Sequence, residues 1–232
     1  NGIANPFSEV VPCSDGWNNA GGTIYLEKGK QYEIYFNHTC VYLEPLSVRL
    51  AWTTPSMYEK AMAEAEQAAR ESDVAIVFAW HQSVSDRLSL EENQDELISR
   101  VAAANPHTVV VLNNGDAVEM PWQDQVPAIL EMWFSGQEGT RATLAVLEGA
   151  VNPAGRLPVT FPKKLEDLAA RDPKHPERYA PSGRISEKDA KHPNTAYFTE
   201  GLLNGYRWFD AMDKEPLYPF GYGLSYTTFA YG

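Results

Sequence analysis

The sequence is poor in the residues that build metal, redox and nucleic-acid sites. Its two cysteines, Cys13 and Cys40, form no CxxC motif, and its five histidines are scattered along the 232 residues, so we expect no metal and no cofactor. Only 19 lysines and arginines stand against 31 acidic residues, a formal net charge of −12. This balance disfavours nucleic-acid and anionic membrane partners, because both bind basic surfaces. No apolar run approaches the roughly 18 residues of a membrane span.

The cellular compartment stays open at this stage. Cys13 and Cys40 suit either a disulfide in an oxidising compartment or two buried thiols. Asn37-His38-Thr39 fits the glycosylation acceptor pattern, which is short enough to arise by chance. Residues 1–12 do not resemble a signal peptide, but a removed signal would leave no trace. A secreted or periplasmic location is favoured over a cytoplasmic one.

Nucleotide-binding signatures are missing as well. No G-x-G-x-x-G or P-loop follows any expected strand, which counts against a nucleotide-binding α/β protein. Aromatic residues are plentiful instead, with 6 Trp, 12 Tyr and 9 Phe. Flat aromatic faces serve sugar sites and hydrophobic cores alike. The acidic charge is compatible with a neutral ligand such as a sugar.

The first part of the chain, residues 1–54, is typical of β structure. Apolar residues alternate along TIYLEKGKQYEIYFNHT on both sides of Lys28-Gly29-Lys30, which predicts a hairpin. SVRLAW, residues 47–52, alternates again and ends at Thr53-Thr54-Pro55. Fifty-odd residues are too few for a stable sandwich, so we expect a partial β module that leans on another chain or module.

From residue 55 onward, the pattern changes to alternating strands and helices. Ser56 can cap a helix that runs to about Glu71. Three continuous apolar runs predict parallel strands buried on both faces: residues 73–80, 108–114 and 128–134. Between and after them, LEENQDELISRVAAANP and the residues up to about Gly149 predict helices. The order predicts an α/β fold, a three-layer α/β sandwich with a mostly parallel sheet and helices on both faces.

Four motifs later in the chain carry a family resemblance: GQEG (136–139), NPAGRLPVTFP (152–162), EGLLNGYRWFD (200–210) and PLYPFGYGLSYTTF (216–229). In this order they resemble glycoside hydrolase family three, mainly β-glucosidases and related exo-acting glycosidases. The resemblance covers about residues 56–229 and matches the family's second domain. The glycines and prolines of the four motifs are expected to fix turns, and Tyr206, Trp208 and Phe209 are expected to pack. Between these motifs, residues 163–196 predict an excursion with little regular structure, near a binding site or an interface.

The resemblance also implies an arrangement of parts. Residues 1–54 look like the closing strands of a protective-antigen-type β-sandwich, which some family members insert into the second domain, and residues 55–232 look like that second domain. The family's nucleophile is an aspartate on a barrel domain, so no residue of this chain is assigned that role. The expected partners are a neutral β-linked sugar or glycoside and a barrel-bearing chain or segment. A homo-oligomer stays open.

The loop FAWHQSVSDRLSL, residues 78–90, is where the resemblance implies an acid/base, within a pattern similar to Glu-Gly-x-Asp-Arg. Matching Asp86 and Arg87 to that pattern places Ser83 at the glutamate position. A serine hydroxyl cannot act as a general acid near neutral pH. His81 could donate a proton instead, whereas Glu91 and Glu92 are expected in a first helical turn, where the helix dipole favours their ionised form.

Ligands of parallel sheets bind at the carboxyl ends of the strands, so residues 80–87 are expected to face a sugar. Trp80 would offer an apolar face, and Asp86 and Arg87 would offer hydrogen bonds. Alternatively, Trp80 closes the core and Asp86 pairs with Arg87 or caps the helix. Two functions therefore compete: part of a β-glucosidase-like glycosidase, inactive alone, or a non-catalytic carbohydrate-binding or assembly module of the same fold.

Overall fold

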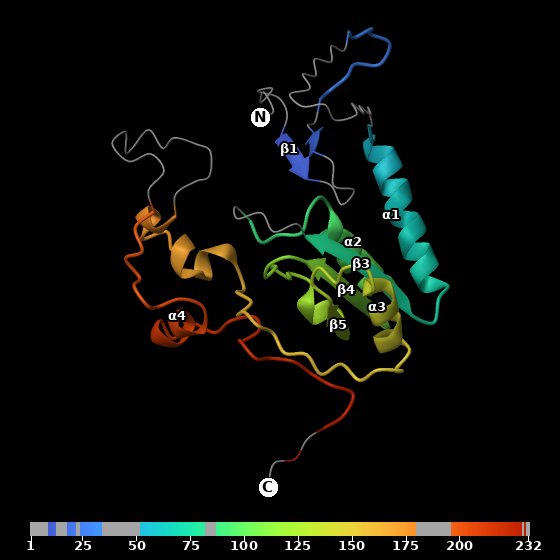
Figure 1. The fold of residues 1–232 in the computed structure, drawn as a ribbon. Coiled ribbons are helices and arrows are strands. Elements are labelled where there is room, and N and C mark those ends of the chain that lie inside the picture. Colours follow the sequence, from blue (N-terminus) through green and yellow to red (C-terminus); the bar gives the residue numbers. More distant parts are fainter. Residues whose placement is uncertain are drawn as a thin grey trace. The chain divides into compact units, whose positions relative to one another are not determined.

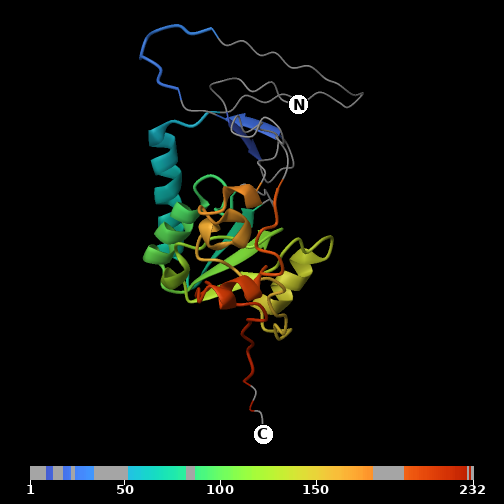
Figure 2. The same cartoon turned by 90° about the vertical axis from the view of Figure 1, so that its left-hand side faces the viewer.

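The computed structural model describes residues 9–12, 18–21, 24–33, 52–81, 87–179, 196–228 and 230. The chain divides into two compact units, Asn1–Ala65 and Glu66–Gly232. Cys13, Asn37, Cys40 and most of the strand expected at residues 47–52 lie outside the described residues. Figures 1 and 2 show the fold from two directions.

The described part of the first unit contains one short antiparallel pair. Strand β1 (Glu9–Pro12) pairs with β2 (Asn18–Gly21). The expected turn at Lys28-Gly29 is present: Gly29 has a φ of 85°, and the Lys30 N–H donates to the Glu27 carbonyl at 3.2 Å. Residues 24–33 contain no strand, so the expected hairpin arms are wrong within that range.

Helix α1 (Pro55–Arg70) begins two residues earlier than a cap at Ser56 predicts. Thr54, not Ser56, is the cap, because its Oγ1 accepts the Met57 backbone N–H at 3.2 Å. Pro55 then occupies the first helical position, where its missing N–H costs nothing and its fixed φ already suits a helix. Ser56 lies inside the first turn, and its hydroxyl is 3.0 Å from that of Thr54.

The second unit is built on a three-stranded parallel sheet in the order β3–β4–β5 (Figure 1). The strands are β3 (Ala75–His81), β4 (Thr108–Asn114) and β5 (Ala128–Glu131). Their register brings the carboxyl ends together, with His81 opposite Asn114 and Leu112 opposite Glu131. The predicted α/β fold with a mostly parallel sheet is confirmed.

Burial of β3 differs from the prediction. Its side chains alternate between buried and exposed, and the largest of them, on Phe78 and Trp80, belong to residues that are 51% and 47% exposed. β5 also departs from the prediction, because each of its four residues is exposed or half-buried. β4 is buried along almost its whole length. The continuous apolar run therefore predicted the strand correctly but not the burial of both its faces. The same residues also fit a strand that has one face exposed.

Helices lie on both faces of the sheet. α2 (Gln94–Ala104) buries Ile98, Val101 and Ala102, and it contacts β3 and β4. α3 (Gly139–Leu147) follows β5 and lies over the opposite face, across a cavity from Phe78 and Trp80. α2 begins at Gln94, so the expectation that Glu91 and Glu92 belong to its first turn is wrong.

The excursion after residue 163 carries three single-turn 3-10 helices and no longer element in its described part: Leu165–Asp167, Ala169–Arg171 and Pro176–Arg178. It packs against α4 (Tyr206–Ala211), whose Trp208 and Phe209 are buried. The Trp208 indole N–H donates to the Asp167 carbonyl at 2.8 Å. Tyr206 is 45% exposed, and its ring packs against that of Phe220, with 5.5 Å between the centroids.

Two motifs that are far apart in sequence lie side by side. Phe161 and Tyr218 form an antiparallel bridge, and the Leu157 N–H donates to the Tyr222 carbonyl at 2.8 Å. The Asn152 side chain extends this pairing, because its Oδ1 accepts the Tyr226 N–H at 2.8 Å. The NPAGRLPVTFP and PLYPFGYGLSYTTF motifs are therefore held together by these hydrogen bonds.

Gly223→Ala is expected to destabilise this pairing. A Cβ at Gly223 would lie 2.6 Å from the Gly155 carbonyl oxygen and 3.0 Å from Arg156, and backbone cannot move aside as a side chain can. We expect a loss of about 1–3 kcal/mol in the free energy of unfolding, as for other overpacked sites, measured by urea denaturation. Gly155→Ala is the matched control, since no atom lies within 4 Å of its Cβ position. Equal losses in both variants would contradict the steric explanation.

Candidate functional site

The carboxyl end of β3 is held by a side chain from α2. The Gln94 amide accepts the Trp80 backbone N–H at 2.7 Å and donates to the Trp80 carbonyl at 2.8 Å. Its nitrogen also donates to the Glu91 carbonyl at 3.0 Å. Gln94 thus fixes the point at which the chain leaves the strand and enters residues 82–86.

His81 and Trp80 face opposite sides of the sheet, as successive strand residues do. The His81 side chain is fully buried, and its Nδ1 lies 3.1 Å from Glu91 Oε1. That distance is within ion-pair range, but the geometry is not that of a hydrogen bond. Nε2 has no hydrogen-bond partner in the described part of the chain. His81 therefore belongs to the buried face of β3, not to the open face that Trp80 shares with Phe78.

The remaining candidates flank or fall within residues 82–86. Ser83 and Asp86 lie outside the described residues, so their predicted places in the loop stay predictions. Arg87 is the first described residue after this stretch and is half-buried.

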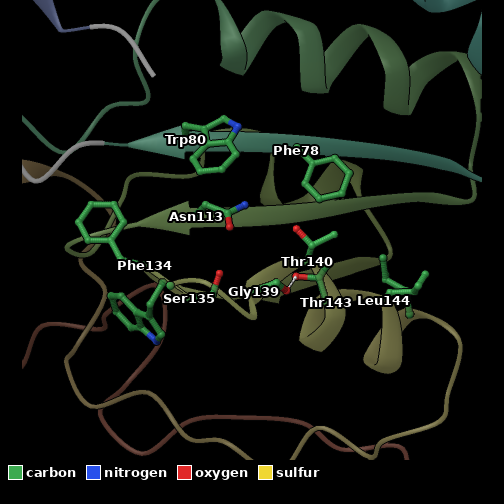
Figure 3. A pocket seen from close by; sticks show the side chains of 12 residues that line it. Phe78, Trp80, Asn113, Phe134, Ser135, Gly139, Thr140, Thr143 and Leu144 are labelled. Atoms are coloured by element: carbon green, nitrogen blue, oxygen red, sulfur yellow. Dashed lines mark hydrogen bonds between the residues drawn. The ribbon is translucent and has the colours of Figure 1, made fainter. Parts of the chain in front are cut away.

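Trp80 lines a cavity of about 460 Å³ between the open face of the sheet and α3 (Figure 3). Aromatic side chains of Phe78, Trp133 and Phe134 form much of its wall, and Asn113 projects into it from β4. Asn113 is 7% exposed and its Nδ2 has no hydrogen-bond partner among the described residues. The remaining lining residues come from the turn before α3 and from α3 itself: Ser135, Gly136, Gly139, Thr140, Thr143, Leu144 and Leu147.

Glu131, at the end of β5, is a buried carboxyl that the sequence analysis missed. Burial raises the pKa of Glu131 from 4.5 to about 7, against the opposing effects of the Trp133 N–H and the Asn114 amide. The Trp133 N–H donates to Glu131 Oε1 at 2.8 Å, and Trp133 itself has a φ of 52°. Glu131 Oε2 and Asn114 Oδ1 are buried without a donor in the described part of the chain. The sequence did contain a signal for this carboxyl, namely a charged residue at the end of an apolar strand.

Replacing Glu131 should change how stability depends on pH. Between pH 4.5 and about 7, folded Glu131 holds a proton that the unfolded chain has lost, so stability falls as pH rises through this window. The 2.5-unit difference corresponds to about 3 kcal/mol. Glu131→Gln keeps an acceptor for Trp133 and should flatten this part of the unfolding profile. Exposed Glu138→Gln is the control, and an equally steep profile in both variants would contradict the prediction.

Within the described residues, no three His, Cys, Asp or Glu side chains come close enough together to hold a metal ion. The helices of that same part of the chain are too short or too polar to cross a membrane.

The comparisons with known proteins agree with this fold. Residues 3–226 match the model of the glycosyl hydrolase family 3 C-terminal domain. This chain belongs to glycoside hydrolase family 3. It is 41% identical to β-glucosidase B of Emericella nidulans over 199 residues, which is 80% of the chain and 23% of that protein. It is 42% identical to the thermostable β-glucosidase B of Acetivibrio thermocellus over 180 residues, 75% of the chain and 22% of that protein.

A solved structure is similar as well. DesR, a β-glucosidase from Streptomyces venezuelae crystallised with D-glucose, superimposes with a TM-score of 0.66 at 41% identity, covering 75% of this chain and 21% of DesR. The chain therefore spans less than a quarter of the length of each of these three relatives.

Proposed function

We propose that this chain is the α/β sandwich domain of a β-glucosidase-like, exo-acting glycosidase and completes the sugar site of a barrel domain on another chain or segment. The observation that carries the proposal is the similarity to DesR, at 41% identity and a TM-score of 0.66. In the same proposal, residues 1–54 end an inserted protective-antigen-like β-sandwich and residues 55–232 form the family domain.

The chemistry divides between the parts. A retaining glycosidase needs two carboxyl groups about 5–5.5 Å apart, one as nucleophile and one as acid/base. The nucleophile belongs to the barrel, so this chain contributes the opposite side of the sugar site. Trp80, Asp86 and Arg87 contact the neutral β-linked substrate, the tryptophan through its face and the other two through hydrogen bonds.

The acid/base position is Ser83, where the family pattern has a glutamate. His81 is the second candidate, and its ring is closed to solvent beside Glu91. Proton donation from His81 to a glycoside would therefore require the surrounding residues to open. This arrangement favours a site in which His81 supports the end of β3 and the proton comes from another group.

Exposed apolar side chains support packing against the rest of an enzyme. Phe198, Leu202 and Leu224 are 76%, 82% and 75% exposed. Exposed apolar patches commonly mark contact surfaces between proteins or domains. A second function is favoured by Ser83 alone: a carbohydrate-binding or assembly module that keeps the fold and has lost the acid.

An aryl β-glucoside tests the proposal. The full-length enzyme should hydrolyse it, and the isolated 232-residue chain should not, because it lacks the nucleophile. Adding the barrel-bearing remainder as a separate polypeptide should restore turnover if the two parts associate. If the isolated chain hydrolysed the glucoside, and a point mutation within the chain abolished that turnover, the assignment of the nucleophile to the barrel would be overturned. A full-length protein that binds glucose without hydrolysing any glucoside would support the non-catalytic alternative.

A further inference from the structure

The side chain of Gln94, the first residue of α2, uses its whole amide on the backbone at the end of β3. Its Oε1 accepts the Trp80 N–H, and its Nε2 donates to the Trp80 and Glu91 carbonyls. A side-chain amide has one acceptor oxygen and two donor hydrogens, so both hydrogens are bonded here. The reversed amide would set its nitrogen against an N–H and its oxygen against two carbonyls. The three bonds therefore fix the orientation of the side chain.

The two bonds to Trp80 resemble those that a neighbouring strand would make. Strand residues bond their N–H and carbonyl groups to the strand beside them, and successive residues turn these groups to opposite edges. The His81 carbonyl accepts the Gly115 N–H at 3.3 Å on the β4 side, so the backbone groups of Trp80 point away from β4. The Gln94 amide thus fixes the backbone of Trp80 as firmly as strand pairing would.

The start of α2 is itself held by the chain that follows β4. Asp95 Oδ1 accepts the Trp122 indole N–H at 2.7 Å, and Trp122 is fully buried. Just before the helix, the Leu88 carbonyl accepts the Glu119 N–H at 2.8 Å. The first turn of α2 is therefore a fixed support for the side chain of Gln94.

The direction of the Trp80 ring depends on that support. Trp80 is 47% exposed, and its ring points into the cavity together with Phe78 and Asn113 (Figure 3). It is the last β3 residue on this face, since His81 points to the buried face. Nearly half of Trp80 contacts no described residue, so packing constrains the ring less than the backbone that carries it.

We propose that Gln94 is a positioning residue of the sugar site: by holding both backbone groups of Trp80, it directs the indole face that this domain presents to the sugar. This inference rests on the proposed function, in which Trp80 contacts the substrate. Gln94 itself does not touch the sugar, and its effect on binding passes through Trp80. General support of the fold would instead act on every contact of the site.

A double-mutant cycle in the full-length enzyme, with D-glucose binding measured by isothermal titration calorimetry, tests this route. Gln94→Met keeps the length of the side chain without its hydrogen bonds and should raise the Kd about 10-fold, the net contribution of one or two hydrogen bonds. Trp80→Ala should raise the Kd at least as much. In the Trp80→Ala background, Gln94→Met should have no further effect, because the ring that Gln94 directs is gone.

Amide hydrogen exchange with residue-level detection tests the hold on Trp80 without a sugar. Gln94→Met should make the Trp80 amide exchange at least about 10-fold faster, as expected when a local hydrogen bond is lost. Gln94→Glu, whose carboxylate accepts the Trp80 N–H but donates to neither carbonyl, is a second variant that should also weaken glucose binding only when Trp80 is present. Gln67→Met replaces an exposed glutamine of α1 and should change neither exchange at Trp80 nor glucose affinity.

Failure of the positioning role and failure of the proposed function give different results. If the Gln94 variants lowered glucose affinity equally with and without the Trp80 ring, or lowered it in neither background, the positioning role would be overturned while the sugar contact stood. If Trp80→Ala left the affinity unchanged, the sugar contact of the proposed function would be refuted, and the positioning role with it. The same holds if the unchanged enzyme bound no glucose.

Discussion

Arg178→Met is expected to lower the free energy of unfolding by about 3–5 kcal/mol, the usual cost of leaving one member of a buried ion pair alone. The Arg178 and Glu200 side chains are 6% and 8% exposed, with Nε 3.5 Å from the carboxylate. Glu200 Oε2 has no hydrogen bond in the described part of the chain, so Arg178 is the charge that compensates it. The guanidinium also donates to Thr199 Oγ1 at 2.8 Å and lies 5.2 Å from the Trp208 ring.

Denaturant unfolding of three variants separates the ion pair from general loss of packing. Lys163→Met removes an exposed pair with Glu215 and should leave stability nearly unchanged. Adding Glu200→Gln to Arg178→Met should recover part of the loss, because the stranded charge is then gone. If Arg178→Met were as stable as Lys163→Met, the buried pair would not hold the excursion against α4.

Ser83→Glu in the full-length enzyme is expected to raise turnover of glucosides with poor leaving groups by about 10²- to 10⁴-fold, the usual contribution of acid catalysis. Activated aryl glucosides should change far less, since their leaving groups need little protonation. The comparison of the two substrate types in steady-state kinetics tests whether Ser83 occupies the acid/base position.

Asp86→Asn and Ser83→Gln complete that experiment. Ser83→Gln has the size of the new side chain without an ionisable proton, so it should not reproduce the gain. Asp86→Asn tests the contact with substrate hydroxyls and should act mainly on KM. An equal effect of Ser83→Glu on both substrate types, or none on either, would show that the loop is aligned wrongly.

The strands of the sheet could be predicted from the sequence, because a continuous apolar run rich in β-branched residues, such as TVVVLNN, is typical of a buried strand in an α/β protein. The sequence did not predict that Phe78 and Trp80 are half exposed, since burial depends on which elements cover a strand and not on the strand alone. The cap at Thr54 was missed for a local reason: Pro55 suits the first helical position, which moves the cap one residue before it.

The site was harder to predict than the fold. The position of Trp80 near the end of β3 followed from the strand pattern. Which face of the sheet Trp80 and His81 each occupy could be assigned only once the structure showed which face of β3 is buried. Glu131 was hidden within an apolar run, and its raised pKa depends on burial by residues distant in sequence. The pairing of His81 with Glu91 was missed because Glu91 was expected inside a helix that begins three residues later, at Gln94.

We propose that this chain forms one side of a glycosidase site and does not carry its nucleophile. A 2-deoxy-2-fluoroglucoside traps the covalent glycosyl–enzyme intermediate of a retaining glycosidase, and peptide mass spectrometry of the labelled full-length enzyme locates it. We expect one glycosyl label, on an aspartate outside these 232 residues. A label on any residue within them would contradict it.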